Sequence, residues 1–573
     1  MLTGLQISNP VLKKSFSALY TGNLGGAVLP SVFAIENEFR KFRYGMRQFD
    51  AYDFGISPGI LRNKKIFTSL AYQRGTRKEQ YFLLTHRQKF GKKLVGGLDF
   101  GAGASQGFYA RQLTAIRNFD IFGLYETKEN RYRLYARFIY NKAGTQENGG
   151  IKTDTNLIGV SAADARTLPV WLTDAERVHR EKAVYFQQQA FIFRQKPDTA
   201  IFTNTPEYNI DLTHSFHFSD KSMVFQAASI HDDYFANTYY DSTLTFDSSH
   251  TRSYLNDLRV NLSAKNFGSL DHWLDADLFA GATHESFKIN QRQLDTLFQD
   301  LSVYGGIRFR VMDVVTLRLR YSQPFETDIA GGERFEALFR YRSFNDFLVA
   351  DIRYENEKRV PDLFSQLNFS NHFIWVNRYP TEKRNRFDIM LGLPWWKFNA
   401  GLSYLSISNM VYYDHSGYPV SHSGTVDAWA ANFSHEFSYR RINLINRLVV
   451  QTTNSAGILR LPRFTSFHGI FYEKAFFRKV LLTQIGVDFR YHDDFYSPYY
   501  HPATGQFILQ DEKSYGDYIF ADAFLNFQVK TARFFFKVEH VNAGWNNKSN
   551  ILIARYPMQG RMFKFGIAWN IFD

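Results

Sequence analysis

Large apolar side chains occupy every second position at the C-terminal end of the chain. They alternate with lysine, glycine, alanine and asparagine, and they are Phe563, Phe565, Ile567, Trp569 and Ile571. A period of two residues predicts a β-strand with one apolar face. Such a long, aromatic strand is typical of the last strand of an outer-membrane barrel, with lipid on one side and a wet lumen on the other. An edge strand of a soluble sandwich has the same pattern, so the rest of the chain must decide.

Segments with the same period recur from about residue 64 to the C-terminus. Clear examples are residues 131–140, 258–265, 303–311, 315–321, 334–342 and 533–539. We count roughly 22–24 segments of about 10–14 residues, a length that suits strands crossing a membrane at a tilt. Short connections are predicted at 311–313, 439–440 and 529–531, and long ones at 143–181, 232–252, 409–424, 493–514 and 544–561. The order of short and long connections is irregular around 196–220 and 343–396, which leaves the strand number open.

The strand pattern predicts an all-β fold, a transmembrane antiparallel β-barrel over residues 61–573, with long outer loops and short periplasmic turns. A soluble sandwich rarely contains so many long strands, and a propeller would show a repeat of about 40 residues. Residues 1–60 have glycine-rich stretches and no clear period. We consider three interpretations for them: a periplasmic segment, an insert in the lumen, or the first strand.

The composition supports a barrel in a membrane. Cysteine is absent, aromatic residues make up 17%, and only 15 residues are proline. Mean hydropathy is −0.33 and no apolar run approaches the length of about 18 residues that a transmembrane helix needs. The net charge of +13 is spread over strands and not gathered in a tail, which disfavours nucleic-acid binding. Residues 2–15 lack the order of a signal peptide, so we expect the numbering to start after a leader.

Seven segments resemble one known family and follow one another in a consistent order. They are residues 19–30, 107–120, 140–151, 371–380, 459–464, 485–510 and 561–572. The most specific are ENGGI at 147–151 and YYHPATGQFILQ at 499–510. Together they resemble the "putative porin" family of Bacteroidota outer membranes, whose other members carry a secretion signal and an N-terminal extension. The resemblance implies an outer-membrane barrel, but it supplies no catalytic or ligand residues.

Arginines gather on one parity of three successive predicted strands. They are Arg308, Arg310, Arg318, Arg320, Arg340 and Arg342. Adjacent strands lie about 4.8 Å apart, so inward-facing guanidiniums would form a positive wall in the lumen and raise the local anion concentration. Four acidic residues share the inward parity and could neutralise this wall instead: Glu336, Asp351, Asp275 and Asp277. Both linings remain open on the sequence alone.

Residues 143–181 are a candidate constriction, either folded into the lumen or projecting outward. Within them, the pattern from Thr173 to Arg177 predicts the capped start of a short helix. His-Asp-Asp occurs at 231–233 and again at 492–494, but neither site offers the six oxygen ligands of a calcium site. We therefore interpret both tripeptides as polar loop residues and predict no metal, cofactor or catalytic residue.

The function predicted from these features is that of a porin in the bacterial outer membrane, which lets small hydrophilic solutes diffuse and prefers anions if the arginine wall is not neutralised. The expected partners are outer-membrane lipid, the solutes, and either an outer-membrane lipoprotein or further copies of the chain. The alternative is a non-conducting structural or assembly barrel whose lumen is filled by residues 1–60 or 143–181. A barrel enzyme is a third, weaker hypothesis, and active transport of the TonB type is disfavoured because no large globular plug precedes the strands.

Overall fold

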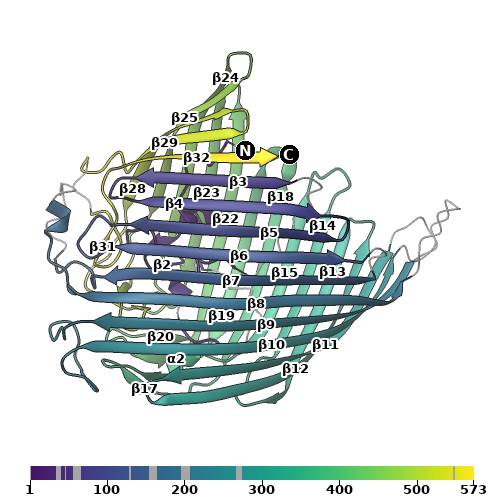
Figure 1. Ribbon diagram of the computed structural model, residues 1–573, viewed down its shortest axis with the longest axis horizontal. Coiled ribbons are helices and arrows are strands. Elements are labelled where there is room, and N and C mark those ends of the chain that lie inside the picture. The colour runs from purple at the N-terminus through teal and green to yellow at the C-terminus, as the bar shows by residue number, and fades with distance from the viewer. Residues whose placement is uncertain are drawn as a thin grey trace.

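Antiparallel strands close on themselves into a barrel in the computed structural model (Figure 1). The structure describes residues 2–33, 41–45, 47–55, 66–127, 131–153, 164–194, 207–265, 274–545 and 549–572. Within these ranges the barrel has 22 strands, which confirms the predicted fold class and lies within the predicted number. No helix in the described part of the chain is long and apolar enough to cross a membrane.

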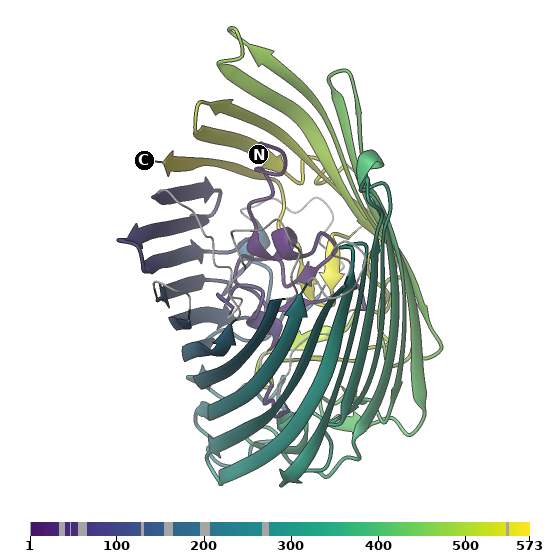
Figure 2. The same ribbon diagram turned by 90° about the vertical axis from the view of Figure 1, so that its right-hand side faces the viewer.

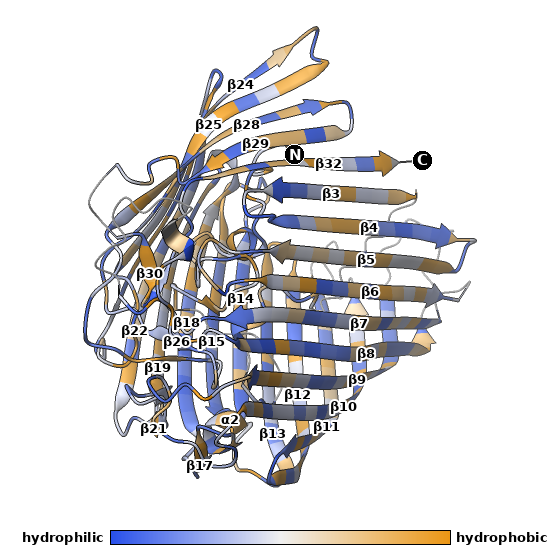
Figure 3. Ribbon diagram, turned by 60° about the vertical axis from the view of Figure 1, so that its left-hand side comes forward, coloured by the Kyte–Doolittle hydropathy of each residue, from blue (hydrophilic) through white to orange (hydrophobic). Residues whose placement is uncertain are grey.

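The barrel strands follow the chain in order around the wall, and each pairs with its neighbours. They are β3 (Phe67–Gly75), β4 (Gln80–Phe90), β5 (Leu94–Ser105), β6 (Thr114–Glu126), β7 (Tyr132–Glu147), β8 (Ala175–Arg194), β9 (Glu207–Ala227), β10 (Thr245–Lys265), β11 (Leu274–Gln291), β12 (Leu294–Val311), β13 (Val315–Thr327), β14 (Arg334–Arg342), β15 (Val349–Arg359), β18 (Glu382–Leu393), β19 (Phe398–Ser408), β22 (Thr425–Tyr439), β23 (Ile442–Thr453), β24 (Phe464–Phe476), β25 (Leu481–His492), β28 (Tyr518–Val529), β29 (Ala532–Glu539) and β32 (Met562–Phe572). Hydrophobic and hydrophilic residues alternate along many of these strands, as the period of two requires (Figure 3).

The C-terminal strand β32 closes the barrel, as the terminal pattern predicts. It pairs with β29 on one side and with β3 on the other, from Lys564 opposite Gly75 to Phe572 opposite Phe67. Phe563 is 65% exposed on the outer face, and Phe565, Trp569 and Ile571 are also exposed there, with Ile567 partly buried. Lys564 between them is buried on the inner face. The contact of the outer residues with lipid remains a prediction.

The long loops lie at one end of the barrel, together with short connections such as residues 76–79 and 292–293, and short turns lie at the other end. We call these the loop end and the turn end. Residues 343–348 and 394–397 are turns, and residues 360–381 are a loop, which resolves the irregular region at 343–396. Of the irregular region at 196–220, residues 196–206 lie outside the described residues and the rest belongs to β9. The other long loops span 148–174, 228–244, 409–424, 493–517 and 540–561.

The helix predicted at Thr173 is wrong. Strand β8 begins at Ala175, which lies opposite Glu147 of β7, and the pairing continues in register for most of the strand. A capping pattern is a local and weak preference. Hydrogen bonds to both neighbouring strands, with burial of every second side chain near the loop end, outweigh it.

The described residues of the N-terminal segment lie inside the barrel (Figure 2). By the N-terminal segment we mean residues 2–33, 41–45 and 47–55. It contains the short helix α1 (Pro10–Lys14), the two-stranded sheet of β1 (Leu19–Tyr20) and β2 (Val28–Leu29), and a 3-10 turn η1 (Arg47–Phe49). The division of the chain into two domains near residue 60 remains a prediction.

The long loops fold together at the loop end and form small sheets of their own. These are β16 (Leu367–Phe369) with β17 (Ile374–Val376), β20 (Val411–Tyr413) with β21 (Pro419–Ser421), β26 (Tyr499–His501) with β27 (Gln506–Ile508), and β30 (Ile551–Ile553) with β31 (Tyr556–Pro557). Two further short helical turns are η2 (Asp164–Arg166) and α2 (Leu363–Gln366), while η3 (Pro394–Trp396) forms a turn at the turn end. Leu172, Phe235, Phe373 and Trp375 come from three loops and pack in one buried cluster.

Replacing Phe563, Phe565 and Trp569 together with lysine should abolish insertion into the membrane. A charged side chain on the lipid face of a barrel costs about 2–4 kcal/mol near the midplane, and three such costs are comparable to the whole stability of a typical protein. The measurement is the heat-dependent shift in gel migration of membrane fractions. A matched variant with leucine at 563 and 565 and phenylalanine at 569 should migrate normally, and a normal shift for the lysine variant would contradict the assignment.

Candidate functional site

On strands β8 to β12 the inner face of the wall is buried towards the loop end and more open to water towards the turn end. On β8, Arg177 and His179 near the loop end are 1% and 2% exposed. On β12, the side chain of Arg308 near the turn end is 44% exposed. The inner positions of β10 and β11 change from buried to partly buried in the same direction. Along these strands the described residues therefore fill the lumen from the loop end and leave the part near the turn end more accessible.

One attachment of the N-terminal segment is to the wall formed by β25 and β28. The side-chain amide of Gln6 donates to Oδ2 of Asp488 at 3.0 Å and accepts from Asn526 at 2.8 Å. Nearby, Gln484 donates to the hydroxyl of Thr3 at 3.1 Å. All these wall residues belong to the buried part of the inner face. The polar side chains therefore recognise this end of the segment specifically.

The segment is also attached to other parts of the wall. Asn118 of β6 donates to the carbonyl of Tyr52 at 2.6 Å, and Asn141 of β7 bonds both the amide and the carbonyl of Phe54 at 3.0 and 3.1 Å. On β12, Asp300 forms a buried ion pair with Lys41 at 2.7 Å. The β6–β7 pair, β12 and the β25–β28 wall lie far apart around the barrel. The segment thus crosses the lumen from wall to wall.

A hydrophobic cluster joins the segment to the loops. Leu19, Leu24 and Phe49 of the segment pack with Tyr500 and Ile553 of the loops, and each is at most 3% exposed. Burying one such side chain contributes about 1.5–3 kcal/mol. The segment and the loops therefore stabilise each other, and neither can move without exposing apolar surface.

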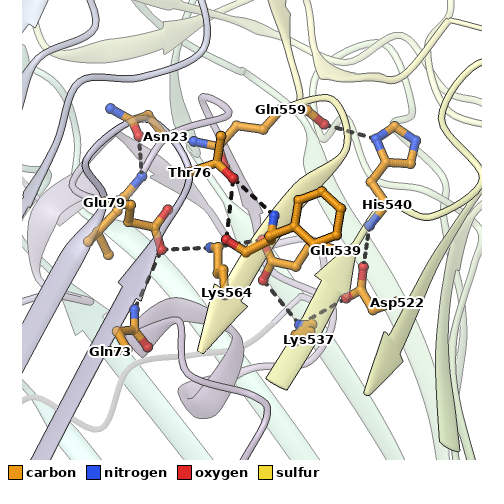
Figure 4. Close-up of polar contacts among 12 residues, drawn as sticks. Asn23, Gln73, Thr76, Glu79, Asp522, Lys537, Glu539, His540, Gln559 and Lys564 are labelled. Atoms are coloured by element: carbon orange, nitrogen blue, oxygen red, sulfur yellow. Dashed lines mark hydrogen bonds and ion pairs between the residues drawn. The ribbon is translucent and has the colours of Figure 1, made fainter. Parts of the chain in front are cut away.

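A row of alternating charges crosses the seam where the barrel closes (Figure 4). We call it the inner charge ladder, and its members are Glu79, Lys564, Glu539, Lys537, Asp522 and Arg490. Their successive ion pairs measure 2.6, 2.8, 3.1, 3.0 and 2.8 Å. Glu79 precedes β4, and the other members lie on β32, β29, β28 and β25. The three acids balance the three bases.

The ladder settles a conflict between like charges. Lys537 and Lys564 lie directly opposite each other in the pairing of β29 with β32, an arrangement that is unfavourable by itself. Glu539 bridges them, because its Oε1 binds the ammonium group of Lys537 and its Oε2 binds that of Lys564. Both lysines are almost fully buried. Since a buried charge without a partner is expensive, each member holds its neighbours in place.

Histidine and aromatic rings stack at the centre of the loops. His372 lies parallel to Phe235 with ring centroids 3.7 Å apart, and His501 contacts the rings of Tyr234 and Phe373. Nδ1 of His372 donates to the carbonyl of Asn237 at 2.8 Å, and Nε2 lies 2.7 Å from the hydroxyl of Thr245, an arrangement that suits a neutral ring. Burial lowers the pKa of His501, which lies in a loop, to about 3, with His372, Arg177 and Arg555 adding to the effect.

Most of the predicted arginines have partners. Arg308 bonds Asp277 at 2.6 Å, Arg310 lies 3.8 Å from Asp275, and Arg340 bonds Asp351 at 2.6 Å. Arg342 pairs with Asp346 at 2.8 Å in the adjoining turn. The guanidinium carbons of Arg318 and Arg320 lie 6.0 and 4.4 Å from the ring centroids of Phe279 and Tyr304. The fourth acidic residue, Glu336, pairs with Arg334.

These arginines share a strand face with residues that contact the N-terminal segment. Arg308 and Arg310 have the parity of Asp300, the partner of Lys41, along β12. The geometry favours a neutralised lining over an uncompensated positive wall. Their role in lining a pore remains a prediction.

The sequence pattern missed the inner charge ladder and the histidine stack. Members of the ladder are separated by as many as 485 residues, and each alone resembles an ordinary polar position of a strand. One signal was present: Lys564 and Lys537 occupy the inward parity of strands that are otherwise rich in phenylalanine. The two His-Asp-Asp sites differ: His231 lies in a loop and bonds Asp174, whereas His492 is the buried last residue of β25 and donates to the carbonyl of Ser17. Among the described residues, no group of acidic and histidine side chains could hold a metal ion.

Replacing Lys564 with methionine should lower the free energy of unfolding by about 3–5 kcal/mol, because Glu79 and Glu539 are left buried without a counter-charge. The measurement is denaturant unfolding in detergent micelles. Adding Glu79→Gln and Glu539→Gln to the same variant should recover part of the loss. Lys397→Met removes an exposed pair with Glu436 and should change stability by at most about 1 kcal/mol. Equal stability of Lys564→Met and wild type would rule out a structural role for the ladder.

Acid should loosen the loop cluster, and His501→Phe should reduce the effect. Above the ordinary histidine pKa of about 6.5 the folded and loosened states are both neutral, so the packing is fully stable. As pH falls from about 6.5 towards 3, only the loosened state takes up the proton. At pH 4.5 the free energy that favours the packed state over the loosened state is therefore lower by on the order of 2–3 kcal/mol. Hydrogen exchange of residues 493–517 at pH 7.5 and at pH 4.5, corrected for intrinsic rates, measures this change in stability. The exposed His415, replaced by glutamine, is the control that should keep the dependence.

Comparison with known proteins places the chain in a family and relates its fold to solved barrels. The closed form of the ferric-catecholate import receptor Fiu from E. coli K12 is 12% identical, with a TM-score of 0.58 over 89% of this chain and 82% of that chain. P. aeruginosa FpvA bound to a heterologous pyoverdine is 12% identical, with a TM-score of 0.59 over 88% and 72%. The FrpB iron transporter of Neisseria meningitidis (F3-3 variant) is 12% identical, with a TM-score of 0.55 over 89% and 82%.

At this level of identity the likeness concerns the fold alone. No curated protein is significantly similar in sequence. The family described as "Putative porin" matches residues 1–573, and this agrees with the closed barrel and with the resemblance in the sequence. The chain therefore belongs to this family of porin-like barrels.

Proposed function

We propose that this protein is an outer-membrane transport barrel that is closed at rest, and that the N-terminal segment must move before a solute can pass. The observation that carries the proposal is the attachment of this segment to β6, β7, β12, β25 and β28 across the lumen. A barrel of this strand number is too wide for its wall side chains to fill, and barrels of 22 strands are typically plugged. The segment supplies such a filling.

Free diffusion of small hydrophilic solutes, predicted from the sequence, requires a continuous aqueous path. The loop-end half of the lumen is occupied by buried side chains from the segment and the loops. Diffusion is therefore proposed for the open state only. The solved barrels of similar fold are described as an import receptor and an iron transporter, and this supports transport in general terms. Their cargo is not transferred to this chain.

We further propose that the open state has little preference for anions. Four of the six predicted arginines have a carboxylate within 4.0 Å, and the other two lie over aromatic rings. Pairs of this kind compensate most of the field that six guanidiniums would produce alone. The net charge of the whole chain is therefore a poor guide to the lumen.

The second candidate is a non-conducting barrel that serves as a structural or assembly partner. The same filled lumen supports it, and a protein of this kind would stay closed after the segment is released. We keep the expected partners as proposals: outer-membrane lipid against the apolar outer face, and a lipoprotein or further copies of the chain. A role as an enzyme is not proposed.

Planar bilayer recording distinguishes the two functions. Wild-type protein should give rare, small conductance steps, and a variant lacking residues 2–33 should give large, long-lived ones, with a reversal potential in a salt gradient close to zero. In a third protein, Gln6→Cys and Asn526→Cys are joined by a short bismaleimide, which is specific because the chain has no other cysteine. It should be silent.

Gel migration controls for folding in each variant. Large stable channels in the wild type would contradict a closed resting state and favour simple diffusion. A correctly folded deletion variant that stays silent would favour the non-conducting barrel.

A further inference from the structure

A cavity of about 540 Å³ opens at the loop end between residues 454–463 and the loop 493–517. Its size is typical of small-molecule sites, which span about 300–1,000 Å³. The residues that give it its chemical character are Leu459, Leu461, Arg463, Asp494, Arg460 and Tyr496. The two connections come from neighbouring hairpins, because β24 pairs with both β23 and β25. None of the residues that line the cavity belongs to the N-terminal segment.

One arginine of the cavity is already balanced. Arg460 forms an ion pair with Asp511, which also bonds Nε2 of His415 at 2.8 Å. The guanidinium carbon of Arg460 lies 5.4 Å from the ring centroid of Tyr496, which positions both side chains. This group therefore forms a fixed, nearly neutral side of the cavity.

Two opposite charges of the cavity remain available. Arg463 and Asp494 are both exposed, and the structure gives neither an ion-pair partner among the described residues. Asp493 also lines the cavity. Its Oδ1 accepts from the backbone amide of Phe464 at 3.1 Å, and its carboxylate is attracted electrostatically to Arg463 without forming an ion-pair contact with it. The cavity thus presents one cation and one anion without an ion-pair contact in the described chain, beside the apolar side chains of Leu459 and Leu461.

We propose that this cavity binds a short zwitterionic peptide with apolar side chains. Arg463 would hold the terminal carboxylate, Asp494 the terminal ammonium, and the leucines and Tyr496 the side chains of the peptide. A simple anion would satisfy only Arg463. An uncharged sugar would cover both charges without satisfying either, and unpaired charges of this kind oppose binding.

The walls of the cavity are also attachment points of the N-terminal segment. The side-chain amide of Gln451 donates to the carbonyls of Ser31 and Pro462, both at 2.6 Å, and Pro462 lies between Leu461 and Arg463. Nε2 of His492 donates to the carbonyl of Ser17 at 3.0 Å, and His492 is followed directly by Asp493 and Asp494. A ligand that draws Arg463 and Asp494 together strains both attachments. This coupling rests on the proposed function, whereas the binding site does not.

Isothermal titration of trileucine into the full-length protein in detergent tests the site. Trileucine should bind, and N-acetyl-trileucine and trileucine amide should each bind about tenfold more weakly, because a charge-assisted hydrogen bond is lost. Arg463→Gln and Asp494→Asn should weaken the binding of trileucine to a similar extent. Arg478→Gln, at an exposed turn on the opposite end, should leave the affinity unchanged.

Absence of heat with trileucine, equal affinity for the blocked peptides, or binding of maltose in preference would each overturn the proposed ligand. Hydrogen exchange of residues 2–33 tests the coupling, and exchange should be faster with trileucine bound. Binding without any change in exchange would overturn the coupling. Neither measurement requires a conducting protein, so a silent deletion variant in the bilayer experiment would contradict the transport function and leave the peptide site standing.

Discussion

Closure of the sheet is the constraint on which the rest of the structure depends. Joining β32 to β3 removes the exposed edges that an open sheet would present to lipid, where unpaired backbone groups cannot be tolerated. The same closure fixes a wide interior, because the diameter of a barrel grows with its number of strands. Wall side chains cannot fill that interior, so the chain fills it with its own N-terminal segment and its long loops.

Filling from one end produces two electrostatic environments within one wall. Near the loop end, charges are removed from water, and they form a balanced ladder in which Lys564 and Lys537 share Glu539. Near the turn end, pairs such as Arg308 with Asp277 remain accessible to water, where an ion pair contributes little to stability. Similar side chains on the same sheet thus act as structural elements at one end and as a hydrated lining at the other.

The sequence was a good guide wherever one local period determined the outcome. The alternation of Phe563, Lys564 and Phe565 predicted a strand correctly, and in this strand Lys564 is buried while its neighbours are exposed. Ala175 was misassigned because the pairing that overrides the capping pattern involves a partner 28 positions earlier, at Glu147. The ladder and the placement of Gln6 depend on contacts that only the closed barrel creates, so no local pattern contains them.

The enclosure of the N-terminal segment has a consequence for the order of assembly. Gln6 contacts Asp488 across 482 positions of sequence, and the last seam joins the first and final strands of the wall. Contacts between such distant positions form late, because the entropy of closing a long loop has to be overcome first. A segment surrounded on all sides must be inside before that seam forms, or enter afterwards through the open end. By the first route barrel closure is the step that traps the segment, and by the second the segment folds against a finished wall.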